Sequence, residues 1–114
     1  MADSPTALKG SVTVGRYRRV TRKVQKGIAK QIMAAYQAKG RDVRLKGMRF
    51  IPSTVIELGG GKFEVIANSV IEVQQPGGLP RRSESIDSVV TIDRLKSGQE
   101  LRGVKIPSLE IAAT

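Results

Sequence analysis

Apolar residues recur every three or four positions over residues 21–39, which is the spacing of one buried face of an α-helix. The face consists of Val20, Val24, Ile28, Ile32, Ala35 and Tyr36. Thr21 is suited to cap the first turn through its side chain, and Gly40 stands where a glycine commonly ends a helix. The pattern therefore predicts a helix over residues 21–39. Residues 11–20 fit either helix or strand, and the sequence leaves both open.

Gly27 lies inside this predicted helix, where glycine costs about 1 kcal/mol relative to alanine. Such a glycine is useful where another element must come close to the helix backbone, because it has no side chain. We therefore expect a second element to approach the helix closely at Gly27.

Beyond Asp42 the apolar positions alternate with polar ones, which is the two-residue period of β-strands. Gly47 interrupts the first run and predicts a bulge or bend there. Short turns over residues 59–62 and 96–99 predict two hairpins. Residues 74–88 are rich in proline and glycine, so we expect a long irregular loop there. The expected strands are residues 42–50, 54–58, 63–67, 70–73, 89–95 and 101–106.

One amphipathic helix followed by about five or six strands predicts an α+β fold, because short turns favour antiparallel pairing and the helix must cover its apolar stripe. The pattern fits both a mostly antiparallel sheet and a small barrel. At 114 residues the chain has the length of one domain. We expect residues 1–10 to form a flexible N-terminal arm and residues 11–114 to form a single α+β domain.

The charge of the chain is strongly positive and unevenly placed. There are 20 Lys and Arg residues against 10 Asp and Glu, which gives a net charge of +10. The only acids in the first fifty residues are Asp3 and Asp42. Cys and His are both absent, which excludes disulfides, a thiolate nucleophile, a Cys/His zinc site and a histidine base. This composition favours binding of something anionic over catalysis.

The polar side of the predicted helix carries cations of one sign only, and these are Arg19, Arg22, Lys23, Lys26 and Lys30. No acid lies four residues away to relieve their repulsion, which destabilises a helix by a few tenths of a kcal/mol per pair. An external anion is therefore expected to compensate, and a nucleic-acid backbone is the commonest one. An acidic protein surface or an anionic lipid surface would serve as well. Arg44 and Lys46, with Arg49, extend the basic region onto the following strand.

Other motifs favour binding over catalysis. Gly61-Lys62 is followed by Phe63 and a strand, whereas a phosphate-binding P-loop needs Ser or Thr and then a helix. Aromatic residues are too few to form stacking platforms for bases. No cofactor, metal or enzymatic activity is expected. Arg81 and Arg82, in the expected long loop, are candidates for contact with a partner.

The sequence thus predicts a non-enzymatic structural component of a larger nucleic-acid-associated assembly, such as a virion head, neck or tail protein or a ribonucleoprotein component. The alternative is a free-standing, sequence-independent nucleic-acid-binding protein. The expected partners are protein neighbours and the backbone of DNA or RNA, and the protein is expected to be oligomeric. No membrane contact is expected, because no apolar run approaches the ~20 residues of a membrane span. The expected location is the cytoplasm or a virion assembled there.

Overall fold

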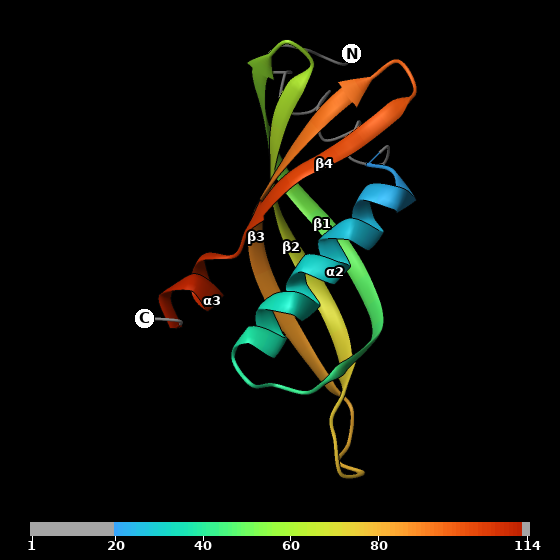
Figure 1. Ribbon diagram of the computed structural model, residues 1–114, viewed down its shortest axis with the longest axis vertical. Helices are drawn as coiled ribbons and strands as arrows, with labels where there is room; N and C mark the ends of the chain where they lie inside the picture. The colour runs from blue at the N-terminus through green and yellow to red at the C-terminus, as the bar shows by residue number, and fades with distance from the viewer. Residues whose placement is uncertain (1–19, 113–114) are drawn as a thin grey trace.

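The structure, a computed structural model, describes residues 20–112, with side chains described as far as residue 109. The four strands form one antiparallel sheet in the order β1-β2-β3-β4, and α2 crosses one of its faces (Figure 1). The α+β prediction is therefore confirmed, whereas the expected arm of residues 1–10 lies outside the described residues, as does nearly all of 11–20. The elements are α2 (Arg22–Ala38), β1 (Arg44–Gly59), β2 (Lys62–Gln74), β3 (Arg82–Leu95), β4 (Gly98–Lys105) and α3 (Pro107–Ala112).

The ends of α2 follow from local chemistry, as the sequence predicts. The Thr21 hydroxyl accepts a hydrogen bond from the Val24 N–H at 3.2 Å and caps the first turn. At the other end Gly40 adopts a φ of 78°, a conformation that favours glycine. The N–H groups of Gly40 and Arg41 donate to carbonyl oxygens in the last turn of α2, which is the Schellman termination.

Gly27 provides the close approach that its position predicts. A Cβ added to Gly27 would lie 2.8 Å from the Cδ2 methyl of Leu101, on β4. The missing side chain therefore lets β4 pack directly against the N-terminal half of α2. This contact fixes the position of the helix relative to the far edge of the sheet.

The sheet has four strands, so the prediction of five or six was wrong. Expected strands 42–50 and 54–58 are one strand, β1, because register shifts between Leu45 and Gly47 and between Pro52 and Thr54 let pairing with β2 continue. Pro52 is tolerated because β1 is an edge strand. Expected strands 63–67 and 70–73 likewise merge into β2. Within the described residues β1 and β4 each have one neighbour, so the sheet is open rather than a barrel.

The prediction of a long loop over residues 74–88 was also wrong. β2 continues to Gln74 and β3 begins at Arg82, so only residues 75–81 lie outside the sheet. The prolines and glycines that predicted the loop all lie within residues 75–81, whereas Ser83, Ser85 and Asp87 occupy alternate positions of β3 and leave Ile86 buried. Arg81 and Arg82 therefore stand at the base of the β2–β3 hairpin and not at its tip.

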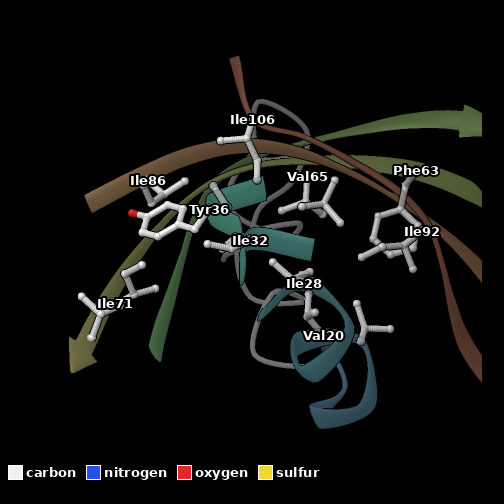
Figure 2. Close-up of a cluster of buried hydrophobic side chains, with 14 residues drawn as sticks. Val20, Ile28, Ile32, Tyr36, Phe63, Val65, Ile71, Ile86, Ile92 and Ile106 are labelled. Carbon is white, nitrogen blue, oxygen red and sulfur yellow. The ribbon is translucent and has the colours of Figure 1, made fainter. Parts of the chain in front are cut away.

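The core lies between α2 and the covered face of the sheet. Ile28 and Ile32 are completely buried and meet residues of the central strands, among them Val65 and Ile92 (Figure 2). Figure 2 shows Tyr36 at one end of the cluster beside Ile86. The predicted stripe of α2 is confirmed as the core-facing side, although Ala35 is only partly buried.

Within residues 20–109, two serine hydroxyls are buried in this core without a hydrogen-bond partner, those of Ser69 on β2 and Ser88 on β3. Burying an unpartnered hydroxyl costs about 1–3 kcal/mol. We therefore expect Ser69→Ala to raise the free energy of unfolding by about 1 kcal/mol, measured by urea denaturation. Ser53→Ala is the control, because the Ser53 hydroxyl donates to the Ile66 carbonyl oxygen at 3.0 Å. A Ser69→Ala variant with a lower free energy of unfolding would show that the Ser69 hydroxyl makes a stabilising hydrogen bond.

Candidate anion-binding face

Four of the five predicted helix cations share the solvent side of α2, while the fifth, Arg19, lies outside the described residues. Val24, Ile28 and Ile32 fix the rotation of α2 because they are buried against the sheet. Four basic positions off this stripe are thereby turned outward, and their side chains are exposed. These are Arg22, Lys23, Lys26 and Lys30, which we call the α2 cations.

The α2 cations form no ion pairs within the described residues. The first turn of α2 contains no acid, and among residues 20–109 no ion pair involves any of the four. Arg22 and Lys23 also lie in the first turn of the helix, where the backbone dipole is positive and favours anions. Helix dipole and side chains thus add to one positive field that favours an external anion.

An open groove of about 560 Å³ runs beside the α2 cations, between α2 and β4. Its two walls are held together by a hydrogen bond of 3.0 Å from the Thr21 N–H to the Gln99 side-chain oxygen, and by the packing of Leu101 on Gly27. All four cations line it, so one elongated anion can reach them together. The remaining lining residues are Val24, Gly27, Gln99, Glu100 and Leu101.

The structure does not bring the cations of β1 into this group. Arg44 pairs across the sheet with Gln74 and Arg49 with Val70, whereas the buried residues Val73 and Ile71 point toward α2. Because alternate residues of a strand face opposite sides, Arg44 and Arg49 lie on the face of the sheet that α2 leaves uncovered. Lys46 is exposed at the register shift between Leu45 and Gly47.

Arg81 and Arg82 are exposed, but their side chains have contacts within the chain. Arg81 Nε donates to the Gln74 side-chain oxygen at 3.4 Å. Arg82 Nε lies 3.7 Å from a carboxylate oxygen of Glu84. Both arginines therefore flank the end of the sheet remote from the groove, and their role in partner contact stays a prediction.

A polar cluster that the sequence analysis missed joins the end of α2 to β3. The Tyr36 hydroxyl donates to Glu84 at 2.5 Å, and Arg41 donates to both Glu84 carboxylate oxygens at 3.1 and 2.8 Å. The Arg41 guanidinium also lies over the Tyr36 ring, 4.7 Å from its centre. No local signal pairs these residues, because Glu84 lies far along the chain from both.

The ionisation of this cluster fits a structural role. Hydrogen bonds from Arg41, and then from Tyr36, lower the pKa of Glu84 to about 2 against the opposing effect of its partial burial. Burial and the bond to Glu84 raise the pKa of the Tyr36 hydroxyl, so it stays protonated as a donor. The cluster thus works as a latch between helix and sheet, with its acid fully ionised at neutral pH.

The described part of the chain adds no metal centre and no membrane-spanning element. Between residues 20 and 112 no group of three or more acidic side chains is placed to hold a metal ion, and no helix has the length and apolar character to cross a bilayer. Comparison with known proteins finds no matching family model, no matching curated protein and no matching solved structure.

Proposed function

We propose that this protein is a non-enzymatic structural component of a nucleic-acid-associated assembly and that it binds backbone phosphates through the α2 cations. The observation that carries the proposal is their arrangement: four cations on one exposed helix face, unpaired among residues 20–109, with two of them in the first turn at the positive end of the dipole. Phosphates of DNA or RNA are anions of high charge density. The assembly would form in the cytoplasm or in a virion produced there.

The proposed binding is independent of base sequence. Among residues 20–109 no aromatic side chain lines the groove, so this part of the chain offers bases no platform on which to stack. Bidentate readout of base edges also needs side chains fixed in orientation, whereas the α2 cations include three flexible lysines. Contacts to phosphate need neither a stacking platform nor side chains of fixed orientation, so they account for the exposed lysines and arginine of α2.

The assembly half of the proposal is supported by the face of the sheet opposite α2. Ile51 and Ile56 are exposed by 40% and 41%. Exposed aliphatic residues on a sheet face are a feature of surfaces that meet other proteins. The free-standing alternative predicts instead that particles sedimenting from a native extract collapse to single chains after nuclease treatment, whereas an assembly survives it.

The binding proposal predicts a specific change in salt dependence. Lys23→Gln with Lys26→Gln should weaken binding to nucleic acid of any sequence and flatten the plot of log affinity against log salt by about 1.5–2. The reason is that binding with fewer phosphate contacts releases fewer counterions from the nucleic acid. Thermal stability should stay the same or rise slightly, because like-charge repulsion on α2 decreases. Fluorescence titrations at several salt concentrations measure the slope.

A variant with the same loss of charge provides the control. Lys62 and Lys105 are exposed, and their register places them on the side of the sheet away from α2. Lys62→Gln with Lys105→Gln should leave the salt slope nearly unchanged. Equal slopes for the two double variants would mean that only net charge matters, and absence of salt-dependent binding by the unaltered protein would remove the nucleic-acid proposal.

A further inference from the structure

A second set of cations lies on β1, apart from the groove. Arg44, Lys46 and Arg49, which we call the β1 cations, are all exposed. Within residues 20–109 none of the three forms an ion pair. Arg44 and Arg49 lie on the face of the sheet opposite α2, and Lys46 lies between them at a register shift. The β1 cations therefore concentrate positive charge at one edge of the sheet.

Arg81 adds a fourth cation from a different part of the chain. Gln74 is the cross-strand partner of Arg44, and its side-chain oxygen accepts a hydrogen bond from Arg81 Nε at 3.4 Å. The Gln74 side-chain nitrogen in turn donates to the Leu79 carbonyl oxygen at 3.0 Å and holds the segment after β2 against the sheet. Gln74 thus links Arg81 to the strand position opposite Arg44. We call the β1 cations together with Arg81 the second basic surface.

The nearby acids leave the second basic surface positively charged. Glu72 lies opposite Gly47 on β1, and Asp42 precedes the strand. Within residues 20–109 neither acid forms an ion pair, and the two are outnumbered by four cations. Three of these cations are arginines, whose planar guanidinium groups match the geometry of phosphate oxygens. The surface is therefore suited to phosphate, although less strongly charged than α2.

The two cationic surfaces face in opposite directions. α2 crosses one face of the sheet and turns its cations away from it, whereas the β1 cations belong to the other side (Figure 1). The groove of the α2 cations also borders β4, which is the opposite edge of the sheet from β1. A duplex of about 20 base pairs stays nearly straight, because the persistence length of DNA is about 150 base pairs. One short duplex can therefore contact only one of the two surfaces.

We infer that the second basic surface is a second phosphate-binding site, so that a single chain bridges two segments of nucleic acid. The inference rests on the proposed function, in which the α2 cations hold the first segment. The net charge of +10 exceeds the charge of the four α2 cations, so the chain still attracts a second segment. The second site is the weaker of the two, because no helix dipole assists it and Glu72 lies beside it.

A bridging assay with the full, nuclease-treated chain and a DNA duplex of about 20 base pairs tests the inference. One copy of the duplex is immobilised on beads, and a second copy in solution carries a fluorophore. We expect the unaltered protein to capture the fluorescent duplex at low salt and to lose it as the salt concentration rises. Arg44→Gln with Arg49→Gln should lower this capture at least about tenfold while changing the affinity for the immobilised duplex less than about threefold.

A variant with the same loss of charge provides the control. Lys62→Gln with Lys105→Gln removes two cations at the start of β2 and the end of β4, so capture should stay nearly unchanged. Circular dichroism establishes that each variant is folded. Lys46→Gln with Arg81→Gln should act as Arg44→Gln with Arg49→Gln does, and it serves if that variant is unstable.

Three results would overturn the inference. A protein that binds the immobilised duplex but captures no second duplex has a single site, and the proposed function would remain intact. Capture that persists in both variants of the second basic surface would mean that bridging comes from association of copies. An equal loss of capture in the control variant would mean that only net charge matters. A protein that binds no duplex at all would remove the proposed function as well.

Discussion

Ile28→Ala is expected to lower the free energy of unfolding by about 2–5 kcal/mol. Ile28 has no exposed surface and lies at the centre of the α2 stripe against the sheet. Its truncation removes apolar contacts and leaves a cavity that a close-packed helix and sheet can only partly close. Urea denaturation followed by far-ultraviolet circular dichroism measures the change.

The same experiment needs an aliphatic residue outside the core as its reference. Leu79→Ala removes side-chain volume at an exposed position between two strands and should change the free energy of unfolding by less than about 0.5 kcal/mol. A loss below about 0.5 kcal/mol for Ile28→Ala would mean that the stripe of α2 does not face the core.

Glu84→Gln is expected to lower the free energy of unfolding by about 2–3 kcal/mol at neutral pH. The substitution removes the negative charge to which both Arg41 and Tyr36 donate hydrogen bonds, and the Glu84 side chain that carries it is only 15% exposed. Arg41 is then left without its ion pair, and the hydrogen bonds that hold the end of α2 on β3 weaken. Urea denaturation at pH 7 gives the magnitude.

The latch also makes stability depend on pH in a defined direction. The pKa of Glu84 is lowered from 4.5 to about 2, so the folded protein binds fewer protons than the unfolded chain between these values. Its contribution is fully present above pH 4.5 and is lost as the pH falls toward 2. The difference in stability between the unaltered protein and Glu84→Gln should therefore shrink over this interval.

Glu100→Gln is the control for this prediction. A carboxylate oxygen of Glu100 also lies near an arginine, 3.5 Å from Arg102, but its side chain is half-exposed. Such surface pairs contribute about 0–1 kcal/mol, so this variant should differ little from the unaltered protein at any pH. A constant gap between Glu84→Gln and the unaltered protein from neutral to strongly acidic pH would show that the latch does not depend on ionised Glu84.

Several parts of the fold are determined by residues close together in the sequence. Helix α2 and both of its ends follow from an apolar period, a threonine and a glycine within about twenty positions. The bulge near Gly47 and the turn after Gly59 likewise depend on a few local residues. The cationic side of α2 follows too, because the helical period places Arg22, Lys26 and Lys30 on one side once the apolar stripe is buried.

The tertiary structure alone decided which strands continue and which residues meet. A polar stretch such as residues 83–88 becomes strand only when β2 is present to accept its backbone hydrogen bonds. The same pairing separates Arg44 and Arg49 from the α2 cations, because cross-strand register determines which face each side chain occupies. Glu84 meets Tyr36 and Arg41 only after α2 has packed on the sheet. Local periodicity reflects only residues that are close together in the sequence. The register of the strands, the sheet face of each side chain and the latch depend instead on contacts between segments far apart in the chain.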